Sequence, residues 1–194
     1  MNGTGEGETL NEEELIAKAK DGNDHAFQQL IQLHYTTVEK FAYQLGNRRD
    51  EIEDITQEVF IRVYRFLDQF TQAKFTTWLY KITLNVTRDM ARKRSQNLKK
   101  VFKFQQQPQE DHPQVETHLL QSEEDRMLHI CLQTLNEKYR TPIILFYFHD
   151  KKYEEIAEIM SISLSTVKTR ILRGKTMLRK AVEEFEAKEG GKYG

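Results

Sequence analysis

The sequence has little of what cross-links or interrupts a folded chain. Among its 194 residues there is one cysteine, and there are only three prolines and nine glycines. A single Cys131 excludes a disulfide within the chain and any zinc site built on cysteines. Because residues that break regular structure are so few and helical periodicity covers most of the chain, the sequence predicts an all-α fold.

Two further absences concern membranes and metals. The sequence contains no apolar run long enough to cross a bilayer, and its first 14 residues are acidic, without the apolar core of a secretory signal. We therefore expect a soluble, cytoplasmic protein with no direct membrane insertion. The six histidines are scattered without the spacing of metal ligands, so we expect no metal site and no cofactor.

The formal net charge of −1 hides an uneven distribution of charge along the chain. Residues 88–103 contain seven Lys or Arg and one acid, Asp89, while residues 168–180 contain six Lys or Arg and no acid. Residues 105–125, between them, contain six acids and no Lys or Arg. Two basic segments separated by an acidic connector predict two contacts with one polyanion.

Helical periodicity divides the chain into two parts. Helices of the first part are expected from Asn11, which can cap with Glu14, after the punctuation at residues 21–24, from about Asp50 to Leu67, and from Thr76 or Thr77 to about Arg94. The second of these has an apolar stripe that runs from Phe27 to Leu45 and ends at Gly46. Residues 96–121 are Gln-rich, contain Pro108 and Pro113, and break the periodicity. The predicted architecture is two small helical domains, residues 1–95 and 122–194, joined by a flexible linker at 96–121.

Residues 153–178 have the pattern of a helix-turn-helix. Its expected buried residues are Ile156, Ala157, Ile159, Met160, Ile162, Val167, Ile171 and Leu178. At about 100° per residue, the opposite side of the second helix carries short hydroxyls and long cations, which suit base edges and phosphates. The candidate DNA-binding residues are Ser165, Thr166, Lys168, Thr169, Arg170, Leu172 and Arg173. A solvated basic hairpin is the alternative, and Ser161 stands where a turn glycine is usual, but the packing pattern favours DNA binding.

The third predicted helix carries an apolar residue in the middle of its exposed, charged face. Ile61 lies almost opposite the expected buried stripe of Ile52, Ile55, Val59, Val63 and Phe66. An apolar anchor ringed by polar side chains is typical of a docking surface, although an incidental surface isoleucine is equally compatible with this helix alone. The candidate docking residues are Asp54, Gln57, Glu58, Ile61, Arg62, Tyr64 and Arg65.

Aromatic residues surround the loop 68–74, and a cationic stripe follows them on the fourth helix. The stripe consists of Lys81, Asn85, Arg88 and Arg92, which fall within a narrow sector. Such a combination suits single-stranded DNA, whose bases stack or flip while cations hold the backbone. The candidate residues are Phe75 and Trp78 together with the stripe. Core packing is the favoured alternative for Trp78, and Asp89 is expected to brace the fold through an ion pair.

These segments together resemble the extracytoplasmic-function group of bacterial RNA polymerase sigma factors, in the sigma-seventy family. The resemblance rests on EIEDITQEVFIRVYRFLDQF at 51–70, KFTTWLYKITLNVTRDMARKR at 74–94, LNEKYRTPIILFYF at 135–148 and the helix-turn-helix. They cover both predicted domains in order, which is more specific than a helix-turn-helix alone.

The resemblance implies a role for each surface. Residues 1–95 would form the region 2 domain, whose third-helix face binds RNA polymerase core and whose fourth helix opens and reads the −10 element, with Asn85 helping to hold a flipped base. Residues 122–194 would form the region 4 domain, which reads the −35 element of promoter DNA. Such a protein supplies promoter specificity and no enzymatic chemistry. An anti-sigma factor, often membrane-anchored, is a further implied partner.

Two other classes of function remain compatible with the residues alone. A stand-alone transcriptional regulator would use the same helix-turn-helix and employ its first domain for dimerisation or sensing. A helical adaptor fits the all-α prediction but leaves both basic segments unexplained. Dependence on the polymerase separates the first class from a sigma factor, because a regulator binds duplex sites alone.

Overall fold

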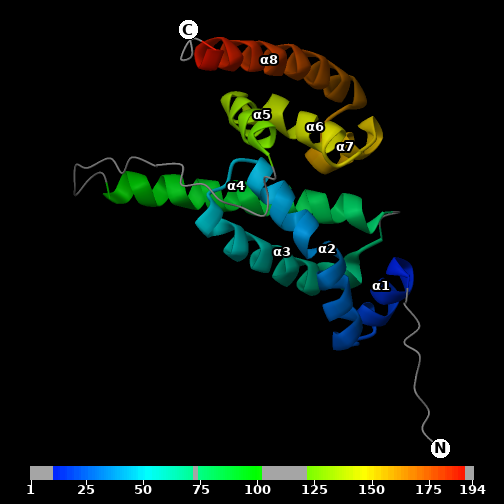
Figure 1. Ribbon diagram of the computed structural model, residues 1–194. Helices are drawn as coiled ribbons and strands as arrows, with labels where there is room; N and C mark the ends of the chain where they lie inside the picture. The colour runs from blue at the N-terminus through cyan, green and yellow to red at the C-terminus, as the bar shows by residue number, and fades with distance from the viewer. Residues whose placement is uncertain (1–10, 72–73, 102–121, 191–194) are drawn as a thin grey trace, which may run out of the picture.

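The structure, a computed structural model, describes residues 11–71, 74–101 and 122–190. Over these ranges the chain forms helices and no strand, which confirms the all-α prediction. The long helix α4 (Phe75–Val101) crosses between two groups of helices (Figure 1). No helix within the described ranges has the length and apolar character needed to span a bilayer. Most of the predicted linker, residues 102–121, lies outside the described residues.

The first unit consists of α1 (Glu12–Lys20), α2 (Asp24–Gln44), α3 (Ile52–Phe66) and α4, with short 3₁₀ turns at Arg49–Glu51 and Leu67–Gln69. The predicted cap of α1 is confirmed: Glu14 N donates to Asn11 Oδ1 at 2.9 Å, and Asn11 N donates to Glu14 Oε2 at 3.3 Å. The core of this unit draws on all four helices and includes Leu15, Leu30, Ile55, Val59, Val63 and Leu79. The buried stripe predicted for α3 is therefore correct from Ile52 to Val63.

Two details of the first unit differ from the sequence-based prediction. Phe66 is 40% exposed, because it is the last residue of α3, and Leu67 in the following 3₁₀ turn takes the buried position. In addition, α4 continues to Val101 instead of ending near Arg94. Residues 95–101 contain neither Gly nor Pro, so nothing in the local sequence stops the helix.

The second unit consists of α5 (Glu123–Thr134), α6 (Glu137–Tyr147), α7 (Tyr153–Met160) and α8 (Leu164–Gly190). The pair α7–α8 is the predicted helix-turn-helix. Ser161 adopts the left-handed conformation, with φ of 53°, at the position where glycine is usual. Ser163 Oγ then accepts a hydrogen bond from Thr166 N at 3.2 Å and caps the start of α8. The predicted packing is confirmed, since Val167 is fully buried and Ile171 nearly so.

A proline in α6 and a glycine in α8 have distinct structural roles. Pro142 lies buried in the second turn of α6, where it leaves the carbonyl of Lys138 without its helical N–H partner. Gly174 lies where α8 approaches α6 most closely, because a Cβ there would lie 2.9 Å from Ile143 Cγ1 and 3.2 Å from the Tyr139 carbonyl oxygen. Helical periodicity does not indicate this close approach, which holds the outer face of α8 in place.

The two units pack directly against each other, with α7 against α4 (Figure 1). One buried apolar cluster contains Phe41, Leu45, Tyr80 and Leu84 of the first unit together with Leu132, Ile143, Ile156 and Val167 of the second. The helix α4 is therefore covered on two sides, by its own unit and by the second unit. The sequence predicts the two units but not this arrangement.

A polar group lies at the centre of the contact between the units. His149, in the turn between α6 and α7, places Nδ1 2.7 Å from the Tyr80 hydroxyl and Nε2 2.7 Å from Oε1 of Gln44. Because an amide oxygen only accepts hydrogen bonds, Nε2 carries the proton and Nδ1 accepts from Tyr80. The rings of Phe41 and Tyr80 pack on the imidazole at centroid distances of 5.2 and 5.1 Å. In the neutral imidazole both ring nitrogens therefore have a hydrogen-bond partner.

Polar contacts extend outward from this centre. Lys74 Nζ lies 3.0 Å from Glu155 Oε1, and Arg88 Nε lies 2.6 Å from Glu137 Oε1. Gln133 also donates to the Gln44 carbonyl at 3.0 Å. We call these contacts, together with the His149 group and the shared apolar cluster, the inter-unit contact.

Acid is expected to weaken the inter-unit contact through His149. Burial, and then the charges of Lys151 and Lys40, lower the pKa of His149 from 6.5 to about 4. The titratable Tyr80 and Asp150 also lie near it. Between these two pKa values the unfolded chain binds more protons than the folded chain, so the His149 contribution is complete above pH 6.5 and is lost as the pH falls toward 4. We expect a loss of about 1–2 kcal/mol of unfolding free energy, less than the full shift would give because the ring is partly exposed.

The measurement is urea unfolding of the natural chain and of His149→Gln between pH 7.5 and 4.5. Glutamine can hydrogen-bond to both neighbours but does not titrate, whereas the carboxylates titrate in both proteins. The stability difference between the two proteins should therefore shrink or reverse as the pH falls. A difference that stays constant over this range would contradict the assignment.

Candidate functional site

The exposed side of α3 forms one wall of an apolar groove. Ile61 is 51% exposed and Tyr64 60% exposed, as periodicity predicts. Ring contacts shape the groove: Phe27 meets Tyr64 edge to face at 5.0 Å, and Tyr35 stacks on Phe60 at 6.2 Å. The groove has a volume of about 670 Å³ and is lined by Phe27, Ile31, Tyr35, Gln57, Phe60, Ile61, Tyr64 and Arg65. An apolar groove with a polar rim suits a helix of a partner protein.

The α2 wall of this groove was not identified from the sequence. Phe27 and Ile31 of α2 are only partly buried, at the edge of the core. The available signal is the spacing of Phe27, Ile31 and Tyr35 at i, i+4 and i+8, which forms a second apolar row beside the core stripe.

Arg62 differs from the other predicted docking residues. Its guanidinium lies 2.7 Å from Glu58 and 2.9 Å from Asp89 of α4, and only 25% of its side chain is exposed. The hydrogen bond to Glu58, followed by the one to Asp89, outweighs burial and raises the pKa of Arg62. Arg62 thus ties α3 to α4 instead of facing solvent, because its sector of α3 lies next to the passing helix. Asp89 also pairs with Arg92 at 3.0 Å, so its predicted role as an ion-pairing brace is confirmed.

The cationic stripe of α4 lies on the surface in the predicted sector. Asn85, Arg88 and Arg92 are exposed, and Lys81 is half-buried. Two of the cations already hold carboxylates, Arg88 that of Glu137 and Arg92 that of Asp89. The carboxamide of Asn85 points to no partner that the structure records, and it remains open for a base or a backbone group.

Phe75 requires a correction. Its side chain is 2% exposed and packs against Phe70 and His34, at ring distances of 5.6 and 5.3 Å, so it offers no face to a nucleic-acid base. The first residue of α4 points inward and anchors the loop that precedes it. Trp78 is half-buried against Phe70 at 5.1 Å, which agrees with the core-packing alternative for that residue. Lys20 Nζ donates to the Phe70 carbonyl at 2.6 Å and holds the same loop from α1.

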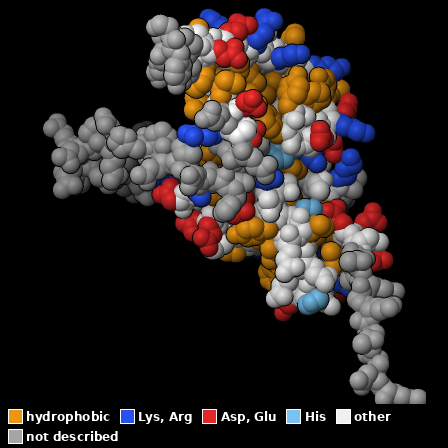
Figure 2. All heavy atoms as spheres, viewed as in Figure 1, with side chains coloured by type: hydrophobic (Ala, Val, Ile, Leu, Met, Phe, Trp, Pro, Cys, Tyr) orange, Lys and Arg blue, Asp and Glu red, His pale blue; other side chains and the backbone are white. Residues whose placement is uncertain are grey.

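The outer face of α8 borders a polar groove. Thr169 and Arg173 are exposed, and Leu172 is 69% exposed, as predicted. The groove has a volume of about 330 Å³ and is lined by Lys138, Tyr139, Ser165, Thr166, Thr169, Arg170 and Arg173. Lys and Arg side chains gather along the outer edge of the second unit (Figure 2). Hydroxyls can hydrogen-bond to base edges, and cations can pair with DNA phosphates, so this exposed face suits contact with DNA.

The α6 side of this groove was missed by the sequence reasoning. Lys138 and Tyr139 come from the first turn of α6, and a hydrogen bond from Arg173, aided by Lys138, lowers the pKa of the Tyr139 hydroxyl. No sequence spacing links these residues to α8, since only packing brings the two helices together. Across the described ranges, the structure contains no cluster of three or more side chains that could hold a metal ion.

Comparison with known proteins places both units in one family. Residues 30–97 match the family described as Sigma-70 region 2, and residues 125–178 match Sigma-70, region 4. The chain is 33% identical over 179 residues to the ECF RNA polymerase sigma factor SigW of Bacillus subtilis, covering 88% of this chain and 96% of that protein. It is 28% identical to the ECF RNA polymerase sigma-E factor of Haemophilus influenzae, covering 91% and 97% respectively.

Solved structures agree with this result. CnrH in complex with the cytosolic domain of CnrY superposes with a TM-score of 0.67 at 25% identity, covering 88% of this chain and 96% of that one. The sigma factor RpoE from Bartonella quintana, in complex with the anti-sigma factor NepR, has the same fold, with a TM-score of 0.67, 23% identity and coverage of 81% and 96%. The chain therefore belongs to the extracytoplasmic-function group of RNA polymerase sigma factors, which direct promoter-specific initiation of transcription.

Proposed function

We propose that this chain binds the core of RNA polymerase and brings it to promoters by reading two separate DNA elements. One observation carries the proposal: three surfaces of different chemistry lie on separate helices of a single small chain. They are the apolar groove between α2 and α3, the cationic stripe of α4 and the hydroxyl-rich outer face of α8. In this proposal residues 1–95 act as region 2 and residues 122–194 as region 4.

The groove between α2 and α3 is the proposed polymerase-binding site. Ile61 and Tyr64 supply exposed apolar area at its centre, while Asp54, Gln57 and Arg65 supply a polar rim. A central apolar anchor that becomes desolvated within such a rim provides most of the free energy of a protein interface. Glu58 and Arg62 contribute by holding α3 against α4.

The α4 stripe is the proposed site of strand opening at the −10 element. Asn85 can hydrogen-bond the edge of a base turned out of the duplex, and Lys81, Arg88 and Arg92 can hold the backbone of the separated strand. The outer face of α8 is the proposed reader of the −35 element. There Thr169, Leu172 and Arg173 would contact base edges in the major groove, and Ser165, Thr166, Lys168 and Arg170 would contact phosphates.

An anti-sigma factor is the proposed inhibitor of this chain. Both superposed relatives were solved in complex with a second protein, the cytosolic domain of CnrY in one case and the anti-sigma factor NepR in the other. The similarity of fold over at least 81% of this chain supports a comparable partner here.

Reconstituted transcription tests the proposal. The purified chain should associate with sigma-free core polymerase and enable it to start RNA synthesis at defined positions on genomic DNA. Specific binding of a duplex site by the chain without polymerase, together with no stimulation of core enzyme, would indicate a stand-alone regulator instead.

The reading of the −35 element gives a more specific expectation. Arg173→Ala should weaken promoter binding by about 1–3 kcal/mol, since it removes one contact to a base or phosphate. Transcription from a cognate promoter should fall, while association with core polymerase stays unchanged. Filter binding and run-off transcription with the reconstituted holoenzyme measure the two effects.

Arg179→Ala is the matched control, because Arg179 is an exposed arginine of the same helix outside the groove. Equal promoter strength and unchanged base preference for Arg173→Ala and Arg179→Ala would show that this face of α8 does not read DNA.

A further inference from the structure

The last residue of α1 contacts the connection between α3 and α4, close to the start of the α4 stripe. We infer that Lys20 is a positioning residue for the strand opening assigned to that stripe, because it fixes Phe70 and, through Phe70, the ring of Trp78. This inference rests on the proposed function of the α4 stripe. It gives α1 a part in handling single-stranded DNA, although no residue of α1 lines the two grooves or belongs to the stripe.

Lys20 contacts both the backbone and the ring of Phe70. Its Nζ donates to the Phe70 carbonyl oxygen at 2.6 Å, and the same atom lies 5.4 Å from the centroid of the Phe70 ring. A hydrogen bond from a charged donor is about twice as strong as one between neutral groups, and the ring face adds a cation–π attraction. The amide of Phe70 also has a partner, since it donates to the Leu67 carbonyl oxygen at 3.0 Å. The backbone of Phe70 is therefore held through both of its polar groups.

A lysine near the end of a helix can be explained by the helix dipole alone, which favours cations there. Lys18 fits that explanation, because it lies in the same last turn of α1 and is exposed. Lys20 differs in two respects: it is half-buried, and its ammonium reaches a carbonyl 50 positions further along the chain. Among the side chains that the structure describes, no carboxylate pairs with Lys20, so an ion pair does not explain its direction either.

Phe70 extends this contact to the start of the stripe. Its ring packs on that of Trp78 at a centroid distance of 5.1 Å, with an angle of 35° between the ring planes. At about 100° per residue, Trp78 falls in the same sector of α4 as Lys81 and Asn85. Both aromatic side chains are half-buried, so each keeps part of its surface exposed at this end of the stripe. The position of Phe70 therefore determines which part of the Trp78 ring stays accessible beside the stripe.

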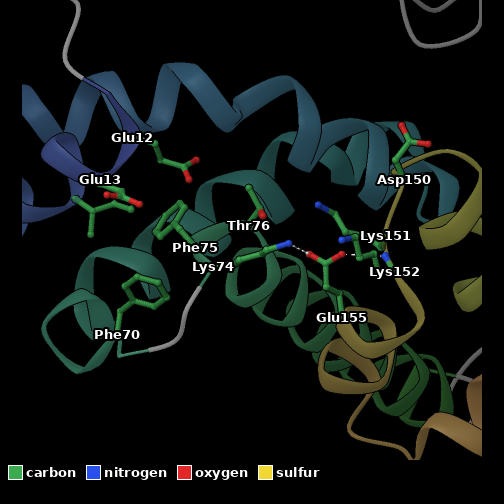
Figure 3. A pocket seen from close by; sticks show the side chains of 11 residues that line it. Glu12, Glu13, Phe70, Lys74, Phe75, Thr76, Asp150, Lys151, Lys152 and Glu155 are labelled. Carbon is green, nitrogen blue, oxygen red and sulfur yellow. Dashed lines mark hydrogen bonds and ion pairs between the residues drawn. The ribbon is translucent and has the colours of Figure 1, made fainter.

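Packing alone does not hold Phe70 against α1. A cleft of about 760 Å³ opens beside Phe70 and Phe75, and Glu12 and Glu13 of α1 also line it (Figure 3). On this side Phe70 borders open space instead of a packed helix. Phe75 differs, because its ring is 2% exposed and is fixed by the core. Phe70 lies at the opposite end of the connection without comparable burial, so the contact from Lys20 supplies the restraint that the core does not.

Loss of the Lys20 contact should leave the fold intact but loosen the aromatic pair of Phe70 and Trp78. Lys20 is not part of the core of the first unit, and buried Leu15 and Ile16 keep α1 in place. A loosened pair would have to be immobilised again whenever a separated strand binds beside it. Ordering one such side chain on binding lowers the affinity by about three- to tenfold, so we expect a loss of this size in single-strand binding.

The natural fluorescence of the full-length chain measures this positioning, because Trp78 is the single tryptophan. Lys20→Met keeps a side chain of similar length but has no donor, so looser packing of Phe70 should admit water to the indole. The emission of Trp78 should then shift to longer wavelength, and acrylamide should quench it more strongly. Lys20→Arg retains a charged donor and should stay close to the natural chain. Lys18→Met is the matched control, since it removes the same charge from an exposed position of α1.

The same three variants are then compared in the reconstituted holoenzyme. For Lys20→Met, the affinity for a labelled template mismatched open over the −10 region should fall about three- to tenfold. It should stay at the natural level for Lys20→Arg and Lys18→Met. Association with core polymerase should be unchanged in all three variants. A defect confined to the opened template separates positioning from a general loss of structure, which would lower both affinities.

Each other result overturns the inference. Unchanged Trp78 emission in Lys20→Met would show that the contact does not hold the aromatic pair. A shifted emission with natural affinity for the opened template would show that the contact is structural only. An equal defect in Lys18→Met, or a failure of Lys20→Arg to retain binding, would mean that the directed hydrogen bond is not the cause. A failure of the proposed function is seen separately, as an inability of the natural chain to bind the opened template with core polymerase, whatever the emission of Trp78 shows.

Discussion

Ile61→Glu should weaken association with RNA polymerase core by about 2–4 kcal/mol, or roughly 30- to 1000-fold. Ile61 is 51% exposed at the centre of the groove, with Tyr64 beside it and aromatic residues of α2 opposite. A buried carboxylate at an interface loses its hydration without gaining a partner. Because the side chain is half in solvent, the same change should leave the unfolding free energy almost unaffected.

Leu33→Glu is the matched control for this change. Leu33 is also on the surface of the first unit, at 57% exposed, but it does not line the groove. Titration of labelled core enzyme with both variants, alongside their urea unfolding, separates lost binding from lost folding. Wild-type affinity of Ile61→Glu for the core, or equal weakening by Leu33→Glu, would remove the groove from the proposed binding site.

Asn85→Ala should slow promoter opening on duplex DNA by about 10- to 100-fold. Its carboxamide is exposed on the stripe, and a contact to a flipped base is available only after the base pairs separate. Loss of such a contact removes about 1–3 kcal/mol from the open state alone. The defect should be much smaller on a template whose −10 region is mismatched open and whose flipped position is abasic, since the lost contact has no counterpart there.

Permanganate footprinting of the reconstituted holoenzyme on both templates measures this difference. Ser95→Ala, a change at an exposed polar position further along α4, should behave as the natural chain on both. Equal opening of the duplex by Asn85→Ala and the natural chain would mean that the stripe holds only the DNA backbone. Asn85 would then have no role in base recognition, and the surrounding cations would make the DNA contacts of the stripe.

Local signals in the sequence were sufficient to predict most of the helices and the residues exposed on their outer faces. The cap formed by Asn11 and Glu14 follows from two residues that are three positions apart. The exposure of Ile61 and Leu172 follows from the helical period alone. These properties arise within one or two turns of helix, so no distant part of the chain needs to be known. The motif pattern of the two units was for the same reason enough to suggest the family.

Where two elements meet, local signals gave wrong or incomplete answers. Phe75 lies among aromatic residues that suggested a stacking platform, but the core between α2 and α4 has room for its ring and buries it. Arg62 reads as part of an exposed face, yet α4 passes close enough for Asp89 to bind it. Burial of both is decided by a neighbour distant in sequence, and periodicity within one helix contains no information about that neighbour.

The sequence by itself predicted an all-helical chain, an exposed isoleucine on the third helix, a cationic stripe and a helix-turn-helix with hydroxyls outward. Only the tertiary structure decided what borders those surfaces: the α2 wall of the groove, the Tyr139 side of the α8 groove, and the carboxylates of Glu137 and Glu155 on the cations of the first unit. These pairings join residues 49 and 81 positions apart. They depend on how whole apolar faces pack together, a property of the folded chain and not of any local run of residues.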